Sequence, residues 1–275
     1  MYTTDFSKLK RDLQTKVEGL KEYFSKRVVI VAYSGGVDSS VVAELAHRFA
    51  QRAIAVTADS PTVLPGEIQE AVKLARSRNW EHRVITINEI EEKNFRKNPP
   101  NRCYYCKKFL SKELHEIASE VGADIIVEGT NFTEVKGHRP GLRALKENQI
   151  FSPLLENSLT KTETRELAHF LGLANADKPS LACLSSRFPY GVEITLEKLQ
   201  RVGKAERYII DNYNIRTIRV RDHEGLARIE VAPEERIKLL EPKIFDDLHE
   251  TLKSFGFSYV AVDCLGYRTG ALNES

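Results

Sequence analysis

A short loop of small and polar residues near the start of the chain has the composition of an anion-binding site. Its residues are Ser34, Gly35, Gly36, Val37, Asp38, Ser39 and Ser40, and the β-branched run Val28 to Tyr33 precedes it. An apolar-periodic stretch follows, so the pattern predicts a strand, a loop and a helix N-terminus. Unpaired N–H groups and the helix dipole favour an anion there, and Gly35 and Gly36 allow positive φ and close approach of the backbone. We therefore expect a phosphate ligand.

Two common phosphate-binding motifs do not describe this loop. The sequence contains no G-x-x-x-x-G-K-[ST] string, and the adjacent glycines do not fit G-x-G-x-x-G. The alternative without a ligand is a Gly/Ser turn that caps a helix, with Asp38 at its start. The complete string between a strand and a helix favours the phosphate site.

Two of the four cysteines form a Cys-x-x-Cys pair that we expect to open a helix. Cys103 and Cys106 follow the irregular segment Asn98-Pro99-Pro100, and Arg102 and Lys107 flank them. Helix N-terminal placement and neighbouring positive charge both favour thiolates. A redox pair, half of a zinc site and chance all remain open, although the sequence has no second Cys-x-x-Cys and no H-E-x-x-H string.

Cys183 begins a polar segment, Cys183 to Gly191, that reads as a linker. Together with Cys103 and Cys106 it offers three thiolates, which can hold a [4Fe-4S] cluster and leave one iron open to a ligand such as hydrosulfide. Inert or redox-active thiols are the alternative. Cys264 lies in a strand-like run and is expected to be buried packing.

The composition is that of an ordinary globular chain. Of 275 residues, 41% are hydrophobic and 29% charged, and 41 Lys and Arg stand against 39 Asp and Glu. The absence of a basic excess weighs against a bulk nucleic-acid binder. No apolar run approaches the roughly 20 residues of a membrane span, and Met1 to Asp5 lack a signal-peptide pattern. We expect a cytoplasmic protein.

Short β-branched runs alternate with stretches of helical periodicity through the first two-thirds of the chain. The expected strands cover 28–33, 53–57, 82–87 and 124–127, and the expected helices cover 38–51, 65–79, 107–121 and 161–171, the last ended by Gly172. This repeat predicts an α/β fold with a parallel, doubly wound sheet. The Ser34 loop, Asp59 with Ser60, and Glu128 to Asn131 follow three strands, so these strand ends are expected to face one pocket.

The last third of the chain has a different order of elements. A helix over 196–211, strands over 217–221 and 227–231, a helix over 233–255 and a strand over 259–263 are expected. This order predicts a small α+β domain. We therefore expect a nucleotide-binding domain over 1–184 and a substrate-binding and oligomerisation domain over 185–275.

Arginines suggest a second anion site in that domain. Arg219 and Arg221 are two apart on a strand and should project from one face. With Ser186, Arg187 and Arg268 they are candidates for binding phosphate and carboxylate groups, which guanidinium suits better than ammonium. The alternative is a solvated strand face on which Arg228 and Glu230 form a surface ion pair.

Several single residues are weaker candidates for the nucleotide site. Lys161, at a helix start, is expected to reach the phosphates of the ligand, with a surface lysine as the alternative. Asp59, Ser60 and Gly129 are expected to border the nucleotide, with a helix-capping turn as the alternative for the first two. Tyr104 and Tyr105 are expected to pack rather than to stack on a cofactor.

The Ser34 to Ser40 string resembles the SGGxDS loop of the PP-loop ATP pyrophosphatases, which cut ATP between its α and β phosphates to adenylate a substrate. In that group the loop holds the pyrophosphate, and an acid such as Asp38 helps to place Mg²⁺. Within the group the chain is similar to the LarE family of ATP-dependent sulfur transferases. The matching residues are the loop, Arg139 to Leu142, Cys183 to Gly191, Arg219 to Arg221 and Gly266 to Gly270, and the resemblance covers nearly the whole chain.

The LarE resemblance implies a substrate and a sulfur source. The substrate would be a pyridinium biscarboxylic acid mononucleotide, whose two carboxylates become thiocarboxylates on the way to the nickel-pincer nucleotide of lactate racemase. One version of the family consumes the cysteine at the position of Cys183 as sulfur donor and lacks the other two cysteines. Members with all three carry a [4Fe-4S] cluster, so Cys103, Cys106 and Cys183 are expected to be cluster ligands that survive turnover. The resemblance also implies a homo-oligomer, for which it suggests six subunits.

Other functions share parts of this pattern. A tRNA thiolase of the 2-thiocytidine type also combines the loop with three cysteines and a cluster, but this chain has neither a basic excess nor an evident RNA-binding extension. NAD and GMP synthetases share the adenylation but use ammonia and need no cysteine triplet. A nucleotide-sensing binding protein would keep the loop without turnover.

Overall fold

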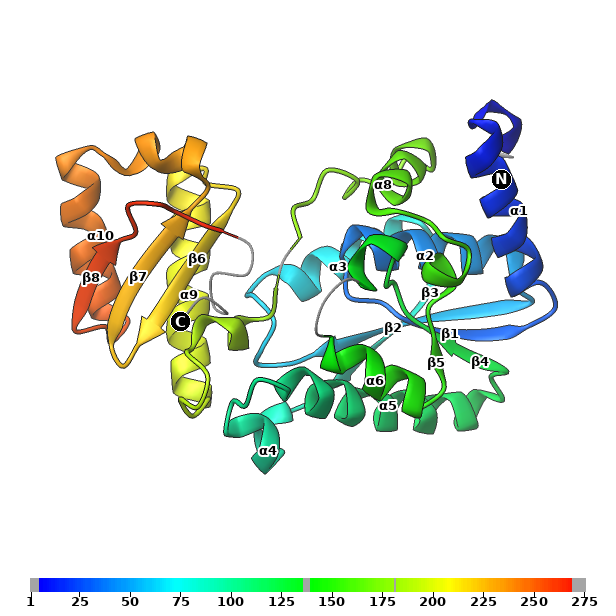
Figure 1. Ribbon diagram of the computed structural model, residues 1–275, viewed down its shortest axis with the longest axis horizontal. Coiled ribbons are helices and arrows are strands. Elements are labelled where there is room, and N and C mark those ends of the chain that lie inside the picture. Colours follow the sequence, from blue (N-terminus) through cyan, green and yellow to red (C-terminus); the bar gives the residue numbers. More distant parts are fainter. Residues whose placement is uncertain (1–4, 136–138, 181, 269–275) are drawn as a thin grey trace. The chain divides into compact units, whose positions relative to one another are not determined.

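The computed structural model describes residues 5–135, 139–180 and 182–268 and shows two compact units (Figure 1). Unit 1 comprises 1–59, 67–87 and 103–180, and unit 2 comprises 60–66, 88–102 and 181–275. Two segments from the first half of the chain therefore belong to the second unit, which the order of elements in the sequence did not indicate. Met1 to Thr4, and Thr269 with Gly270 of the last matching motif, lie outside the described residues.

Unit 1 is built on a five-stranded sheet in the order β3-β2-β1-β4-β5. The strands are β1 (Val28–Ala32), β2 (Arg52–Asp59), β3 (Glu81–Thr86), β4 (Ile125–Val127) and β5 (Ile150–Phe151), and all neighbours pair in parallel. From β1 the chain runs outward to β3 and then returns to β4 on the other side of β1. This order confirms the predicted α/β, doubly wound fold and puts its topological switch point between β1 and β4. Strand β5 was not predicted, because two residues carry no periodicity.

Helices cover both faces of this sheet (Figure 1). They are α1 (Arg11–Phe24), α2 (Val37–Phe49), α3 (Glu67–Ser77), α5 (Arg102–Val121), α6 (Pro140–Glu147), α7 (Pro153–Glu156) and α8 (Lys161–Phe170), with short 3₁₀ turns η1 (Phe6–Lys8) and η3 (Phe132–Val135). Helix α5 begins at Arg102, so Cys103 and Cys106 do open a helix. Gly172 has φ +66° after α8, which confirms its predicted role as a helix stop.

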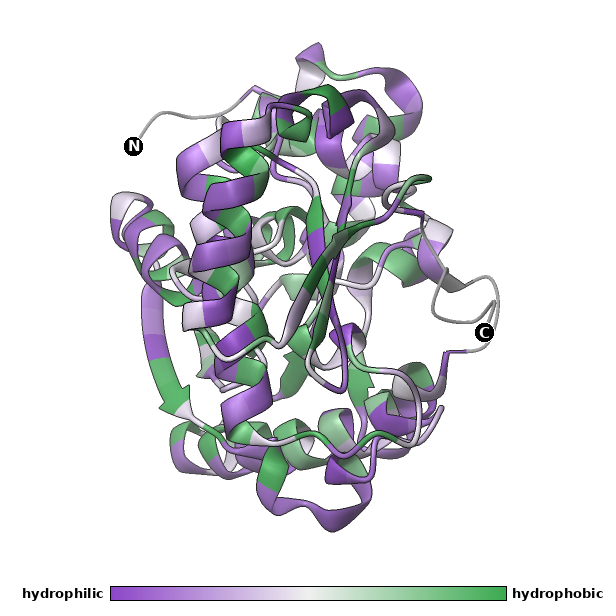
Figure 2. Cartoon of the chain, turned by 90° about the vertical axis from the view of Figure 1, so that its left-hand side faces the viewer, coloured by the Kyte–Doolittle hydropathy of each residue, from purple (hydrophilic) through white to green (hydrophobic). Residues whose placement is uncertain are grey.

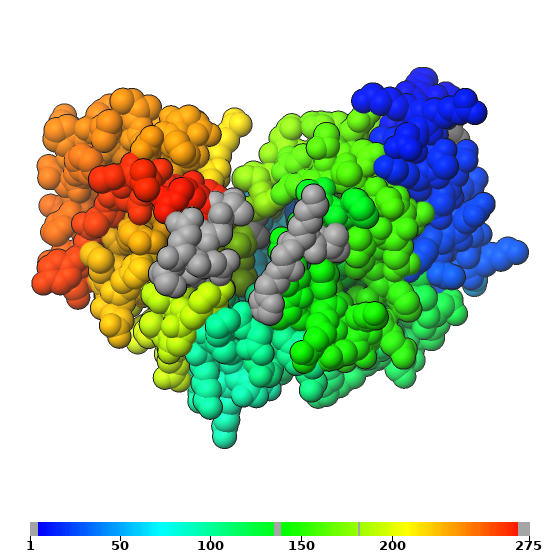
Figure 3. Space-filling view, in the orientation of Figure 1, coloured from blue at the N-terminus to red at the C-terminus, as the bar shows by residue number. Residues whose placement is uncertain are grey.

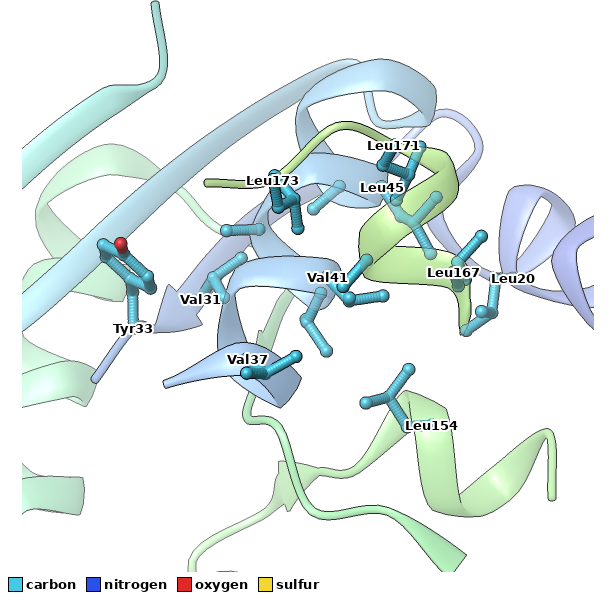
Figure 4. Packing of buried hydrophobic residues seen from close by; sticks show 14 of the residues in the cluster. Leu20, Val31, Tyr33, Val37, Val41, Leu45, Leu154, Leu167, Leu171 and Leu173 are labelled. Atoms are coloured by element: carbon cyan, nitrogen blue, oxygen red, sulfur yellow. The ribbon is translucent and has the colours of Figure 1, made fainter. Parts of the chain in front are cut away.

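The pleat of β1 divides the apolar side chains between two layers. Val29 and Val31 belong to a core that α1, α2 and α8 complete, and Figure 4 shows Val31 converging with Val41 and Leu45. Ile30 points to the other face and packs with α5 and α6. Because both faces are buried, the central strands are apolar throughout, which is why they were easy to predict.

Unit 2 contains a three-stranded mixed sheet in the order β6-β7-β8. The strands are β6 (Ile218–His223), β7 (Leu226–Val231) and β8 (Tyr259–Val262), with helices α4 (Lys93–Arg96), α9 (Leu196–Tyr213) and α10 (Pro242–Ser254) and 3₁₀ turns η2 (Glu89–Glu91), η4 (Leu184–Arg187) and η5 (Pro233–Leu239). Strands β6 and β7 are antiparallel, and β7 and β8 are parallel. Glu224 and Gly225 both have positive φ, as a tight two-residue hairpin requires. Figure 2 shows hydrophilic and hydrophobic residues alternating along the helices.

Two expectations about unit 2 were wrong. The single helix expected over 233–255 is divided into η5 and α10, because Pro242 keeps the preceding Glu241 extended, at φ −80° and ψ 132°. The segment 183–191 is not a linker, because Leu184, Arg187 and Phe188 are buried within unit 2.

The surface of unit 2 exposes several large apolar side chains. Ile237 on η5, Leu240 after it and Phe245 on α10 are exposed. The segment that contains η5 and α10 is orange in Figure 3. None of the helices in the described ranges combines the length and the hydropathy that a membrane span requires.

Replacing Leu45 tests the central role of the α2 layer. Leu45→Ala removes a side chain that is fully buried and should lower the free energy of unfolding of unit 1 by about 2–5 kcal/mol. The only tryptophan, Trp80, lies in the same core, so its fluorescence in a urea titration reports on this unit. Val84→Ala, at a side chain 45% exposed, should cost under about 1 kcal/mol. Equal losses would contradict the assigned packing.

Candidate active site

The loop between β1 and α2 is held in shape by its own hydroxyl groups. Ser39 Oγ donates to Gly36 O at 3.1 Å and accepts from Ser34 N–H at 3.2 Å, and Ser34 Oγ lies 3.0 Å from Ser39 Oγ. Ser40 Oγ donates to Gly36 O at 2.8 Å. Because the serines bond to the loop itself, the amides of the first helical turn are oriented before any ligand arrives.

The two glycines of the loop have different backbone conformations. Gly35 has φ +77°, and a Cβ there would lie 3.0 Å from Ala71 Cβ, so this position needs glycine for both reasons. Gly36 is extended, with φ −76° and ψ 163°, and is the N-cap of α2. The expectation of positive φ therefore holds for Gly35 and is wrong for Gly36.

Asn175 holds the loop from outside and was not predicted. Its Nδ2 donates to Gly35 O at 3.0 Å and to Ser40 Oγ at 2.8 Å. Asn175 lies in a turn after α8, where a single polar residue has no periodicity that would mark it. This bond pairs the Gly35 carbonyl oxygen with an amide donor. The groups of the loop that remain to meet an anion are therefore N–H donors.

The end of β4 packs directly on the first turn of α2. A Cβ at Gly129 would lie 2.6 Å from Ser39 N and 2.8 Å from Ser39 Cα, so only glycine fits. Asn131 Nδ2 donates to Asp38 Oδ1 at 3.3 Å. Two of the three expected strand ends, those after β1 and β4, therefore meet at the switch point.

The third strand end, after β2, agrees only in part with the expectation that Asp59 and Ser60 border the nucleotide. Asp59 is exposed at the end of β2, and its carbonyl accepts from Ile87 N–H at 2.9 Å. Ser60 belongs to unit 2, where its buried hydroxyl donates to Glu89 Oε2 at 2.5 Å and lies 2.8 Å from Thr62 Oγ1.

Charged groups surround Asp38. Burial raises the pKa of Asp38, although the bond from Asn131 and the charge of Lys161 act in the opposite direction. Burial and the charge of Asp38 raise the pKa of Glu134. Lys161 lies at the start of α8, where its Nζ donates to Ser180 Oγ at 2.8 Å. Two carboxylates within electrostatic reach of one another are a ligand set that Mg²⁺ prefers.

Glu128, a weaker candidate for the nucleotide site, accepts hydrogen bonds that hold the local structure. It is buried and accepts from Thr130 N–H at 2.9 Å, from Thr130 Oγ1 at 2.8 Å and from Ser152 Oγ at 2.5 Å. These donors fix the turn after β4 and so support the position of Gly129.

Cys103 and Cys106 lie near the start of α5, about one helical turn apart. Cys103 is exposed and Cys106 is half-buried, and three residues of separation put both on one side of the helix. A Cβ at Gly141, in the first turn of α6, would lie 3.8 Å from Cys103 Cβ. Tyr104 packs on α6, where its hydroxyl donates to Glu147 Oε2 at 2.6 Å.

The other two cysteines are exposed residues of unit 2. The carbonyl of Cys183 accepts from Ser186 N–H at 3.1 Å and from Ser186 Oγ at 2.9 Å, so the turn that begins η4 is fixed. Cys264 is not buried as expected, because β8 ends at Val262 and leaves it on the surface. Among the described residues, no group of three or more His, Cys, Asp or Glu side chains is arranged to hold a metal ion.

The guanidinium of Arg187 donates hydrogen bonds to acceptors within the protein itself. Arg187 is 1% exposed and bonds Glu206 twice, through Nε at 2.6 Å and Nη2 at 2.7 Å. Its Nη1 donates to Ser186 Oγ at 2.7 Å and to the Cys183 carbonyl at 3.2 Å. This geometry favours a role in holding the Cys183 turn over the direct substrate contact expected from the sequence.

Arg219 and Arg221 are buried on β6, so the solvated strand face is excluded. Arg221 donates to Glu230 Oε2 from Nε at 3.1 Å and to the Ser186 carbonyl from Nη1 at 2.6 Å. The Arg219 guanidinium lies over the Tyr267 ring, 4.8 Å from its centroid.

The electrostatics of this arginine cluster favour an anion. Glu230 is buried and is shared by Arg221 and Arg228, so the Arg228–Glu230 pair named in the alternative is present but does not lie on a solvated face. Burial and the neighbouring charge of Arg187 lower the pKa of Arg219. Arg268 is half-buried. A negative ligand beside these arginines would relieve the repulsion that lowers the pKa of Arg219.

Comparisons with known proteins agree with this architecture. The NAD synthase family model matches residues 7–111. An uncharacterized protein of Synechocystis sp. is 42% identical over 95% of this chain and 98% of that protein. The pyridinium-3,5-bisthiocarboxylic acid mononucleotide synthase of Lactiplantibacillus plantarum is 35% identical over 90% of this chain and 89% of the synthase. One subunit of the glutamine-hydrolyzing GMP synthase of Methanocaldococcus jannaschii is 30% identical over 61% of this chain and 57% of its own length.

A parallel sheet with a glycine–serine loop at its switch point defines a PP-loop enzyme that uses ATP. The similarity to the GMP synthase extends over less than two-thirds of this chain. The similarity to the Lactiplantibacillus synthase continues along nearly the whole of both chains. The chain therefore belongs to the LarE family of ATP-dependent sulfur transferases.

A methyl group at position 129 should damage the nucleotide site. Gly129→Ala puts a Cβ 2.6 Å from Ser39 N, so the first turn of α2 must move. We expect ATP affinity, measured by calorimetry with a non-hydrolysable analogue, to fall at least about tenfold, or about 1.4 kcal/mol. Gly122→Ala is the control, because position 122 has φ +68° and no heavy atom within 4 Å of the added Cβ. It should lower stability but leave ATP affinity unchanged, and an unchanged affinity in Gly129→Ala would contradict this packing.

The raised pKa of Asp38 predicts a pH-dependent stability effect. Below the ordinary aspartate pKa of 3.8, the carboxyl group of Asp38 is protonated in both the folded and the unfolded chain. At higher pH, burial makes ionisation of Asp38 less favourable in the folded chain than in the unfolded chain. Asp38→Asn should therefore raise the free energy of unfolding of the nucleotide-free protein at pH 7, and this gain should disappear as the pH falls below about 4. Urea titrations at both pH values measure it. A gain of equal size at low pH would contradict the assigned cause.

Proposed function

We propose that this chain adenylates the carboxylates of a pyridinium biscarboxylic acid mononucleotide and replaces them with thiocarboxylates, for the biosynthesis of the nickel-pincer nucleotide. The observation that carries the proposal is the similarity to the Lactiplantibacillus synthase along nearly the whole chain. The pre-shaped phosphate loop and the exposed Cys183 support its two halves, adenylation and sulfur transfer.

In the first half-reaction, a substrate carboxylate oxygen attacks the α-phosphorus of ATP and pyrophosphate leaves. The amides at the start of α2, together with Ser34, Gly35, Gly36, Val37, Ser39 and Ser40, would bind the pyrophosphate. Asp38 would hold Mg²⁺, with Glu134 as a second carboxylate, and Lys161 would bind phosphate. Gly129, Asp59 and Ser60 would border the nucleotide, Ser60 by its backbone since its hydroxyl is engaged.

In the second half-reaction, a sulfur nucleophile attacks the acyl carbon and AMP leaves. ATP is needed because oxide is a poor leaving group and AMP is a good one. When bound, a [4Fe-4S] cluster held by three cysteines would supply one open iron that carries sulfide. Three exposed or half-buried thiols, two of them in one helical turn, are a suitable donor set, and Cys103, Cys106 and Cys183 would be the ligands.

The arginine cluster of unit 2 would bind the phosphate and carboxylates of the substrate. Arg219, with its lowered pKa, is the strongest candidate, and Arg221 and Arg268 complete the set. Arg187 and Ser186 would keep the Cys183 turn in place for that substrate. Glu206, which sequence patterns did not mark, and Glu230 hold Arg187 and Arg221 in position.

Three further expectations belong to the same proposal. The protein would act in the cytoplasm as a homo-oligomer, with a hexamer as the form that the family suggests, and would take sulfide from an external source. tRNA would not be a substrate, since the chain has no excess of basic residues. Sacrificial donation by Cys183 is the alternative sulfur source within the same family.

Cluster content and intact mass test the sulfur source together. The protein, prepared anaerobically, should contain iron and acid-labile sulfide near four of each per chain. Turnover with ATP, sulfide and the biscarboxylic mononucleotide should release pyrophosphate and leave the mass of the chain unchanged. Cys103→Ser, Cys106→Ser and Cys183→Ser should each lose the cluster, whereas the matched control Cys264→Ser should keep it.

Two outcomes would contradict the proposal in different ways. Loss of the elements of H₂S at Cys183 during turnover would replace cluster delivery by sacrificial donation. Pyrophosphate release that depends on tRNA and not on the mononucleotide would replace the substrate.

A further inference from the structure

One segment of unit 1 contacts two of the groups expected to bind phosphate, and we call this segment, 173–180, the strap. Asn175 of the strap bonds the glycine loop between β1 and α2. Ser180, at the end of the strap, accepts from Lys161 Nζ at 2.8 Å. The strap and both of its partners belong to unit 1. The strap therefore connects the loop and the lysine within a single compact unit.

The strap is anchored at points that do not involve the loop. Ala176 is buried in the core of the unit. Arg165 of α8 donates to the Ala176 carbonyl at 2.9 Å and to the Lys178 carbonyl at 2.7 Å. The Nζ of Lys178 bonds two carboxylates of α3, those of Glu67 at 2.6 Å and Glu70 at 2.8 Å. The position of the strap is therefore fixed by α3, α8 and the core.

The side-chain amide of Asn175 fits in one orientation. Its Nδ2 lies 3.0 Å from Gly35 O and 2.8 Å from Ser40 Oγ. A carbonyl oxygen cannot donate, so the nitrogen and not the oxygen of the amide must face Gly35. Ser40 Oγ accepts the second bond and donates its own hydrogen to Gly36 O at 2.8 Å. Both carbonyls of the glycine pair are therefore bonded, one by Asn175 and the other by a serine that Asn175 holds.

The peptide between Gly35 and Gly36 is the part of the loop that rotates most easily. Rotation of a peptide changes ψ of the residue before it and φ of the residue after it, and glycine accepts positive φ readily. Gly36 has φ −76°, and an added Cβ would lie 3.4 Å from Ser34 Oγ, so the observed conformation does not itself require glycine. In a trans peptide the carbonyl and the following N–H point in opposite directions. A half-rotation would therefore exchange the two groups.

We propose that Asn175 is a positioning residue that locks this peptide with its carbonyl away from the anion and its N–H toward it. The partial negative charge of a rotated carbonyl would repel a phosphate. The apparent affinity falls in proportion to the fraction of chains in the competent conformation. Asn175 raises that fraction, because rotation would leave its Nδ2 with one acceptor instead of two. The lock rests on the proposed binding of pyrophosphate by this loop.

The sequence allows this one peptide to be observed selectively. Gly35-Gly36 is the only Gly-Gly pair among the 15 glycines. Protein labelled with ¹³C at glycine carbonyls and ¹⁵N at glycine nitrogens therefore gives one cross-peak in a carbonyl–nitrogen correlation spectrum, and this cross-peak reports both groups. Asn175→Leu removes the donor and keeps a side chain of similar size. The carbonyl resonance should shift to lower frequency, because a hydrogen bond to the oxygen deshields the carbon, and the cross-peak should broaden as the peptide rotates.

Calorimetry with inorganic pyrophosphate and Mg²⁺ measures the effect on binding. The affinity should fall at least about fivefold in Asn175→Leu, the factor that one such hydrogen bond typically contributes. The affinity for AMP, which leaves the pyrophosphate part of the site empty, should stay unchanged, because the rotation is confined to the loop. Equal losses for the two ligands would indicate general damage to the site and would overturn the lock.

Asn157→Leu is the matched control in the same unit. Asn157 is also half-buried, and its Nδ2 also donates to a backbone carbonyl, that of Pro153, at 2.9 Å. This variant should lower stability, followed by Trp80 fluorescence, but leave the cross-peak and the pyrophosphate affinity unchanged. Asn175→Ala removes the same amide without an apolar branch and should reproduce both effects of Asn175→Leu, which keeps the test if the leucine variant does not fold.

Two results separate the lock from the function on which it rests. A parent protein that binds no pyrophosphate, but whose cross-peak shifts in Asn175→Leu, would contradict the function and retain the lock. A parent protein that binds pyrophosphate, with a cross-peak or an affinity that Asn175→Leu leaves unchanged, would overturn the lock and retain the function.

Discussion

The contact between Gly129 and the first turn of α2 is the constraint on which the nucleotide site depends. A Cβ at that position would lie 2.6 Å from Ser39 N, so the backbone at the end of β4 lies directly against the amides that an anion would meet. The doubly wound order brings these two chain segments together, because β1 and β4 are neighbours although almost a hundred residues separate them. Glu128 fixes the turn through its bond from Thr130, and Asn131 donates to Asp38. A single close approach thus joins the loop, the carboxylate and the switch point.

Unit 2 is organised by a different interaction, the pairing of buried arginines with buried glutamates. Arg187 with Glu206, and Arg221 with Glu230, are nearly inaccessible to water. Removing one partner of such a pair typically costs about 3–5 kcal/mol, so these residues restrict the possible arrangements of η4 and β6 strongly. Arg219, beside them, has a lowered pKa because burial and like charge oppose its ionisation. The unit therefore stabilises the Cys183 turn and presents positive charge with the same cluster.

The sequence predicted the parts of the fold that local patterns encode. The strands β1 to β4 were found because they are short β-branched runs, and the helices α2, α3, α5 and α8 because their apolar residues are periodic. The glycine loop was found because its residue types are unusual. Asn175 and Glu206 were not found, because each acts through partners that are distant in sequence. Local pattern also misjudged burial: segment 183–191 is polar in composition, yet Arg187 is buried by its ion pair. The burial of Cys264 was overestimated, because β8 ends before this residue and leaves it exposed.

Isotope exchange between pyrophosphate and ATP measures the central claim most directly. An enzyme that forms an acyl adenylate reverses the step in the absence of a sulfur nucleophile and so incorporates labelled pyrophosphate into ATP. We expect exchange that requires the pyridinium biscarboxylic mononucleotide and Mg²⁺ and that is lost in Gly129→Ala. Exchange that proceeds without the mononucleotide, or release of ADP and phosphate in place of AMP and pyrophosphate, would contradict the account.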